Sequence, residues 1–326
     1  MKIFSGRCIC FVLTAALAVP MFFGCSVSEK KSSDRISVVC TSFSEYDWAR
    51  EIVGDTDNTD ITYLLGSGVD LHNYQPSAQD ILTISDCDLF IYVGGESDKW
   101  VDDALGEARN SNMKVISLMD VLGASAKEEE IKEGMQAEED EDDSDEPEYD
   151  EHVWLSLKNA QLFCAEICDK LSELDSENAD TYRANLASYT AQLSQLDAQY
   201  SEMVNEAAER TVLFGDRFPF RYLFDDYGID YYAAFVGCSA ETEASFETIV
   251  TLAKKIDELG LDTVFTIENS DPSVAESIIR NTQTKDQQIR ELDSIQSVTS
   301  EAITGGASYI SIMEKNYETL RSVLDR

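Results

Sequence analysis

The sequence predicts an α/β protein with two lobes of parallel β-sheet flanked by helices, joined by one long helix. Three observations lead to this fold class. Short apolar runs rich in β-branched residues alternate with helical segments, which is typical of parallel sheets. The chain has 326 residues, more than a single hydrophobic core normally holds. An unbroken helical pattern over 179–210 separates two such alternating runs.

The first lobe is expected over 36–178. Its opening strand is indicated by Ile-Ser-Val-Val-Cys at 36–40, and glycines close the next two strands. Strands are predicted at 36–40, 61–65, 88–93 and 114–118, and helices at 46–53, 77–85, 100–109 and 157–174.

The linking helix carries a narrow apolar seam. Leu186, Leu193, Leu196, Tyr200 and Met203 recur at helical spacing, and neither Gly nor Pro interrupts the pattern. A long core helix would have the same seam. The length of the helix favours a connector that lies across both lobes.

The second lobe is expected over 211–326 and repeats the alternation of the first. Strands are predicted at 211–214, 231–235, 263–267 and 288–292, and helices at 222–227, 246–259, 272–282 and 309–324.

The N-terminus has the features of an export signal. Lys2 and Arg7 precede an uncharged apolar stretch that is too short for a comfortable membrane span. Gly24-Cys25 resembles the end of a bacterial lipobox, although two phenylalanines stand where Leu and a small residue are usual. We expect 1–24 to be a signal peptide, Cys25 to be lipidated and 25–35 to be a flexible tether. An ordinary cleaved signal or a short anchor is the alternative.

The chain is strongly acidic, with a net charge of -38. Such a charge repels nucleic acid and anionic lipid, so both are excluded as partners. Fifteen of the 24 residues from Glu128 to Glu151 are Asp or Glu. Self-repulsion and the lack of apolar residues predict a disordered loop over 127–149. This loop could raise the local concentration of metal ions, or it could be a solvated segment with no role in metal binding.

Five cysteines lie beyond the signal and Cys25: Cys40, Cys87, Cys164, Cys168 and Cys238. Their number is odd and no Cys-x-x-Cys pair exists. We interpret all five as small buried apolar residues. A zinc–thiolate site is the alternative.

The chain contains two histidines, each in a distinctive motif. His72 lies in Gly-Val-Asp-Leu-His72-Asn-Tyr-Gln-Pro, after a predicted strand, where open α/β sheets place their ligands. His152 lies in Asp-Glu-His152-Val-Trp-Leu-Ser, where the acidic segment rejoins the fold. One such histidine alone is more often structural. Two of them beside acidic residues predict a metal site, because neutral imidazole is a common ligand of zinc and related metals.

These motifs resemble those of the zinc and manganese substrate-binding lipoproteins of ABC transporters, the TroA-like family. The segment around His72 is similar to the family's Gly-x-Asp-Pro-His-x-Tyr-x-Pro, and that around His152 to its Asp-Pro-His-x-Trp-Leu motif. Leu-Asp293-Ser-Ile is similar to the segment that holds the family's last carboxylate ligand. The resemblance covers essentially the whole mature chain.

The third ligand is where the sequence departs from the family. The family has His or Glu in a His-Asp-Ala-Phe or Glu-Gly-Ala-Phe pattern, whereas this chain has Phe-Gly215-Asp216-Arg-Phe. Gly215 stands at the ligand position and has no donor, so Asp216 is the nearest candidate. The alternatives are Glu241, Glu243, Glu268 or water.

The resemblance implies a monomeric, lipid-anchored binding protein on the extracytoplasmic face of the cell membrane. It would capture a divalent metal ion between the lobes and deliver it to an ABC transporter permease. The predicted ligands are His72, His152, Asp216 and Asp293. Zinc is expected because of the acidic loop, with manganese close behind, since oxygen ligands favour manganese or iron.

Two other functions are compatible with a bound metal. A zinc-dependent extracellular hydrolase needs an open coordination position and a general base. The sequence has neither a His-Glu-x-x-His nor a Gly-x-Ser-x-Gly motif, although Glu151 could serve as a base. A surface adhesin with a structural metal is the other alternative.

Overall fold

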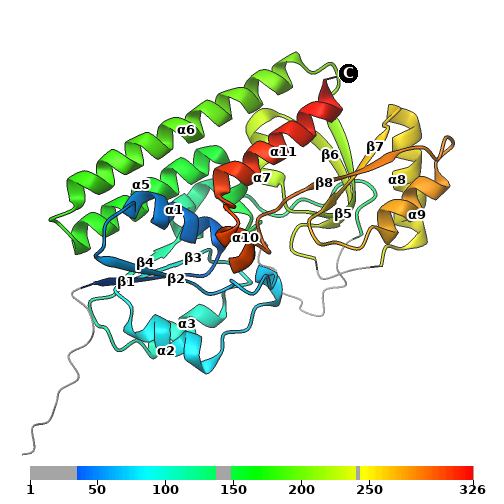
Figure 1. Ribbon diagram of the computed structural model, residues 1–326. Coiled ribbons are helices and arrows are strands. Elements are labelled where there is room, and N and C mark those ends of the chain that lie inside the picture. Colours follow the sequence, from blue (N-terminus) through cyan, green and yellow to red (C-terminus); the bar gives the residue numbers. More distant parts are fainter. Residues whose placement is uncertain (1–34, 137–147, 240–242, 326) are drawn as a thin grey trace, which may run out of the picture. The chain divides into compact units, whose positions relative to one another are not determined.

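The predicted fold class is confirmed by two four-stranded, all-parallel sheets (Figure 1). The computed structural model describes residues 35–136, 148–239 and 243–325. The expected signal peptide 1–24, the lipidated Cys25 and the tether up to residue 34 lie outside these residues. Within the described residues, no helix combines the length and apolarity that a membrane span requires.

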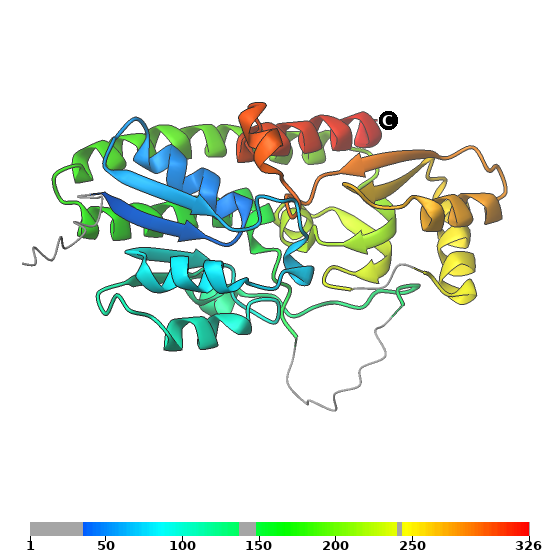
Figure 2. The same cartoon turned by 60° about the horizontal axis from the view of Figure 1, so that its bottom comes forward.

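The first sheet has the strand order β2-β1-β3-β4. Its strands are β1 (Ile36–Cys40), β2 (Thr59–Tyr63), β3 (Leu89–Tyr92) and β4 (Lys114–Ser117). Its helices are α1 (Phe43–Val53), α2 (Ala78–Asp86), α3 (Trp100–Gly106), α4 (Leu118–Leu122) and α5 (Leu157–Leu174). Figures 1 and 2 place α1 and α5 on one face of the sheet and α2 and α3 on the other.

The second sheet has the equivalent order β6-β5-β7-β8. Its strands are β5 (Thr211–Phe218), β6 (Asp230–Val236), β7 (Thr263–Ile267) and β8 (Gln288–Leu292). Its helices are α7 (Arg221–Tyr227), α8 (Phe246–Leu259), α9 (Ser273–Asn281), α10 (Ser300–Thr304) and α11 (Tyr309–Leu324). In both sheets the first strand lies between the second and the third. The connections on its two sides therefore run in opposite directions across the sheet. Ligands bind at such points, outside the carboxyl ends of the strands.

The linking helix α6 (Ala179–Glu206) contacts elements of both halves. It packs on α1 and α5 of the first half, and on α7 and α11 of the second. The seam residues Leu193, Leu196 and Tyr200 are buried, whereas Leu186 is only partly buried. A single apolar stripe therefore faces a continuous core.

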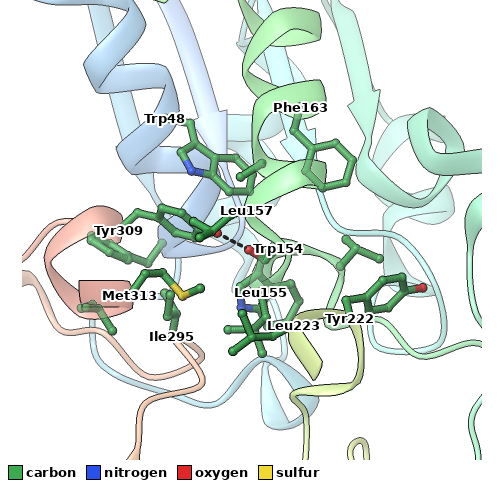
Figure 3. Packing of buried hydrophobic residues seen from close by; sticks show 14 of the residues in the cluster. Trp48, Trp154, Leu155, Leu157, Phe163, Tyr222, Leu223, Ile295, Tyr309 and Met313 are labelled. Carbon is green, nitrogen blue, oxygen red and sulfur yellow. Dashed lines mark hydrogen bonds between the residues drawn. The ribbon is translucent and has the colours of Figure 1, made fainter. Parts of the chain in front are cut away.

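Aromatic residues from distant parts of the chain meet in this core (Figure 3). The ring of Trp48 from α1 lies 5.2 Å from that of Tyr309 from α11 and 5.8 Å from that of Phe163 from α5. The Tyr309 hydroxyl donates to the backbone oxygen of Trp154 at 2.6 Å. All four side chains are at most 1% exposed, so this cluster fixes the segment that follows His152.

Several element boundaries differ from the prediction, and two of the differences have clear local reasons. Helix α1 begins at Phe43 rather than 46, because the Glu45 carboxylate accepts from the backbone N–H of Ser42 at 2.9 Å and caps the first turn. Strand β5 extends to Phe218 rather than 214, with an irregularity between Phe214 and Arg217. The extension places Gly215 and Asp216 inside the sheet instead of in a loop.

The two ends of the acidic segment are hydrogen-bonded, unlike the expected disordered loop; residues 137–147 lie outside the described ranges. Glu128 forms an antiparallel bridge with Tyr149. Residues 127–136, which we call the strap, then run to the free edge of β6, where Gln136 pairs with Phe235 (Figure 2). Lys132 of the strap lies 3.9 Å from the ring centroid of Tyr231. The strap therefore covers a sheet edge that would otherwise expose unpaired backbone groups.

Candidate metal centre

His72 is held after β2 by a single helical turn. The turn, η1 (Leu71–Asn73), begins at Asp70, whose carboxylate accepts from the backbone N–H of His72 at 3.0 Å. The ring Nδ1 lies 2.7 Å from Oγ of Ser97, in the loop after β3. Burial and the facing ring of His152 lower the pKa of His72 to about 3. The imidazole is therefore neutral at physiological pH, as a metal ligand must be.

His152 is fully buried and fixed by one carboxylate. Oδ1 of Asp150 accepts from the backbone N–H of His152 at 2.8 Å and lies 3.0 Å from its Nδ1. A carboxylate accepts but does not donate, so Nδ1 carries a proton and Nε2 faces the site. Nε2 of His152 lies 3.2 Å from Nε2 of His72. The structure thus brings together the two histidines that the sequence singles out.

The histidine pair has a third neighbour that the sequence interpretation missed. One metal-binding atom from each of His72, His152 and Cys238 lies within 4.8 Å of the others. No other group of three His, Cys, Asp or Glu residues is so closely spaced within the described residues. Cys238 comes just after β6, at the carboxyl end of a parallel strand. That position is the one signal in the sequence that could have identified it.

The thiol of Cys238 is protonated without a metal ion. Burial raises its pKa well above the usual value, and the carboxylates of Glu129, Glu151 and Asp150 raise it further. Glu129 belongs to the strap and accepts from the backbone N–H of Cys238 at 3.4 Å. A divalent cation beside the sulfur reverses this preference, because it favours the thiolate. The surrounding carboxylates also offset the positive charge of a bound ion.

Asp216 lies outside the group of three. It is 7% exposed in β5, and its carboxylate accepts from the backbone N–H groups of Arg217 at 2.8 Å and Ile267 at 3.2 Å. The neighbouring Gly215 cannot be replaced by a ligand. A Cβ there would lie 2.5 Å from the Cα of Ala275 in α9. Close packing therefore accounts for the glycine where the family has a ligand.

Asp293 also lies outside the group of three. Its Oδ1 accepts from the backbone N–H of Ile295 at 2.8 Å, within the loop that follows β8. Among the alternatives, Glu268 is bonded to the same loop through Ser294, at 2.7 Å from both its N–H and its hydroxyl. Glu243 is exposed, and Glu241 is outside the described residues.

A polar cleft of about 420 Å³ is lined in part by Asp70, whose carboxylate caps the turn that holds His72. Asp70 and Asn73 contribute to its lining from the first half, and Asp216, Arg217 and Glu268 contribute from the second. Burial alone would raise the pKa of Asp70, but the Arg217 guanidinium outweighs this and holds it below the usual value. Asp70 therefore belongs both to the charged lining of the cleft and to the turn that holds His72.

Comparison with known proteins gives a consistent result. Residues 38–323 match the model of the ZnuA family, described as zinc-uptake complex component A, periplasmic. The chain is 29% identical over 319 residues to the zinc-binding lipoprotein AdcA of Streptococcus pneumoniae, covering 97% of this chain and 61% of that protein. It is 27% identical over 318 residues to the high-affinity zinc uptake system protein ZnuA of Bacillus subtilis, covering 97% and 95% respectively.

Solved structures agree with this match. The Zn(II)-bound ZnuA-like domain of Streptococcus pneumoniae AdcA superimposes with a TM-score of 0.69 at 25% identity, over 90% of this chain and 100% of that domain. The periplasmic zinc-binding protein TroA from Treponema pallidum gives a TM-score of 0.72 at 21% identity, over 90% and 100% respectively. The likeness to TroA, at 21% identity, concerns the fold alone.

Proposed function

The chain belongs to the ZnuA family, and from this premise we propose that it captures zinc outside the cytoplasm and delivers it to an ABC permease. Its Bacillus subtilis relative, of nearly the same length, is named for high-affinity zinc uptake. A substrate-binding component of a transporter is not an enzyme, so the hydrolase alternative is discarded. No contact among the described residues favours the adhesin alternative.

The observation that carries the proposal is the close approach of two imidazoles and one thiol. His72 and His152 are held by partners that leave Nε2 available, and the two nitrogens are 3.2 Å apart. Ligands at about 2.1 Å from a tetrahedral zinc ion lie roughly 3.4 Å from one another. The imidazole nitrogens are therefore already near the separation that zinc requires.

Cys238 is the reason to prefer zinc over manganese. A thiolate is a soft ligand that suits zinc, whereas manganese prefers carboxylate, carbonyl and water oxygens. This argument is stronger than the acidic composition of the segment before His152, which would attract any cation.

Asp216 and Asp293 remain predicted ligands. Each already binds backbone N–H groups of its own segment. Neither carboxylate belongs to the closely spaced group of three. We propose that the first ligands engaged are His72, His152 and Cys238.

The cellular setting forms part of the same proposal. The Streptococcus pneumoniae relative AdcA is named a lipoprotein, and this chain spans 61% of its length. We propose that Cys25 is lipidated and tethers a monomeric protein to the outer face of the membrane. Incorporation of labelled palmitate, abolished by Cys25→Ala, tests this part independently of metal binding.

Competition with a chelator of known zinc affinity tests the central proposal. The purified protein should bind one zinc ion per chain, and prefer it to manganese. His72→Ala and His152→Ala should each abolish tight binding. The site assignment is wrong if either variant retains the wild-type affinity for both metals.

A further inference from the structure

Gln296 is a buried amide beside the histidine pair. It is 4% exposed and lies in the loop after β8. The two ends of the amide are assigned from their neighbours: the end that lies 3.1 Å from both carboxylate oxygens of Asp70 is taken as the nitrogen, because only the nitrogen can donate there. The carbonyl oxygen then lies 2.7 Å from Nε2 of His152.

We propose that this carbonyl oxygen is a metal ligand that completes the histidine–cysteine site, an inference that rests on the proposed capture of zinc. The ion would then be bound by two imidazoles, one thiolate and one amide oxygen, which is a closed tetrahedral set. No carboxylate is needed in direct contact with the ion.

The first support is the arrangement of lone pairs around His152. Its Nε2 has two neighbours that can share a cation, the oxygen of Gln296 at 2.7 Å and Nε2 of His72 at 3.2 Å. With the first proton of the ring on Nδ1, a hydrogen bond here would need a second proton on Nε2, and that proton could bind only one of these neighbours at a time. A metal ion interacts favourably with all three atoms, so this arrangement suits a cation better than a proton.

The second support is the way in which the amide is held. Asp70 accepts both contacts from the amide nitrogen, which fixes the direction of the carbonyl group and increases the negative charge on its oxygen. The same carboxylate accepts from the backbone N–H of His72. One side chain therefore orients two proposed ligands from different halves of the chain.

The third support is the loop that presents Gln296. The preceding residue, Ile295, has a φ of 64°, which is uncommon for a β-branched residue. Asp293 holds this conformation by accepting from the N–H of Ile295, and Glu268 accepts from Ser294 and from the N–H of Gln296 at 3.3 Å. Both carboxylates thus shape the loop that directs the amide toward the histidines.

The test replaces the amide and compares it with the rival carboxylate. In Gln296→Leu the zinc Kd should rise by about 100-fold, the upper end of what loss of supporting groups alone causes. Gln296→His should recover most of that loss, because an imidazole nitrogen can stand near the position of the amide oxygen. Gln288→Leu, the same change at an exposed site in β8, is the matched control. Asp293→Asn keeps an acceptor for Ile295 and should raise the Kd by less than about tenfold.

Cobalt provides a readout that does not depend on affinity. The ligand-field bands of the Co²⁺ protein should change in Gln296→Leu, while the sulfur-to-cobalt charge-transfer band from Cys238 persists. Unchanged bands, a His variant as weak as the Leu variant, or a larger loss in Asp293→Asn than in Gln296→Leu would each overturn the inference. If the wild-type protein itself binds no zinc, the proposed function has failed and not merely this ligand.

Discussion

The guanidinium of Arg217 lies 2.6 Å from the carboxylate of Asp70, 147 positions away along the chain and in the other half. Both side chains are largely buried, at 16% and 17% exposed. Asp70 also caps the turn that holds His72. A single carboxylate thus links an ion pair between the halves to the geometry of the metal centre.

Asp70→Asn should raise the zinc Kd by about 100-fold. Asparagine still accepts from the N–H of His72, so the turn persists, but Arg217 is left as an unpaired positive charge beside the bound ion. Asp60→Asn, at an exposed position of β2, is the control. Chelator competition measures the effect. The double variant Asp70→Asn/Arg217→Gln should recover part of the loss; a double variant no tighter than the single one would show that the charge is not the cause.

Cys238→Ser should weaken zinc binding by about 100-fold or more and narrow the preference for zinc over manganese. The hydroxyl is a harder and much weaker ligand than a thiolate. Cys168→Ser, at another buried cysteine, should leave both affinities unchanged. Titration of each metal against the same chelator gives the ratio of the zinc affinity to the manganese affinity. A zinc-to-manganese ratio equal to that of the wild type would remove Cys238 from the site.

Asp98→Asn should change the pH dependence of stability in the metal-free protein. Burial, with a smaller contribution from Glu151, raises the pKa of Asp98 to about 7, against about 4 in the unfolded chain. Between these values the folded state keeps a proton that the unfolded state releases, so wild-type stability falls as pH rises through this window. The free energy of unfolding of Asp98→Asn should therefore exceed that of the wild type by about 2–4 kcal/mol at pH 8 and be almost equal to it near pH 4.

Urea unfolding at several pH values, with a chelator present, tests this prediction. The free energy of unfolding of the variant, relative to that of the wild type, should rise from pH 4 to about pH 7 and then level off. Asp102→Asn, at an exposed site in α3, should follow the wild-type curve. Parallel curves for Asp98→Asn and the wild type would contradict the assignment of a shifted group.

Trp154→Phe should lower the free energy of unfolding by about 2–4 kcal/mol. The indole Nε1–H donates to the backbone oxygen of Ser294 at 2.9 Å, and the substitution leaves a buried acceptor and a small cavity. Trp100→Phe is the matched control, because its Nε1 has no hydrogen-bond partner among the described residues. Thermal unfolding distinguishes the two; equal losses would mean that the bond to Ser294 contributes nothing.

Most of the regular elements were predictable because local patterns determine them, but the short helices α4 and α10 were not predicted. The strands at 36–40, 263–267 and 288–292 and the helices at 157–174, 246–259 and 309–324 have the expected bounds. The extension of β5 was not predictable, because its last residues lack the apolar run of a strand. They are held there by pairing with β6.

The metal centre was predictable only where a motif carried it. The two histidines stand in recognisable motifs. Cys238 is interpreted as a core residue, like the other cysteines, because a buried cysteine and a metal-binding cysteine look alike in a sequence. Gln296 has no sequence signal at all. Its role depends on the fold bringing Asp70 and His152 to the two ends of one amide.

The meeting of Tyr309 with Trp48 and Trp154 in the core also determines when the protein can fold. The backbone N–H of Tyr309 donates to the carboxylate of Asp47, 262 positions earlier, at 2.8 Å. The core of the first half therefore lacks a buried aromatic ring and a hydrogen-bond donor until α11 has joined it. Contacts of such large sequence separation form late and slow folding. A chain that ends before α11 would leave Trp48 and the capping carboxylate of Asp47 without these partners, so the core of the first half is complete only once α11 has packed against it.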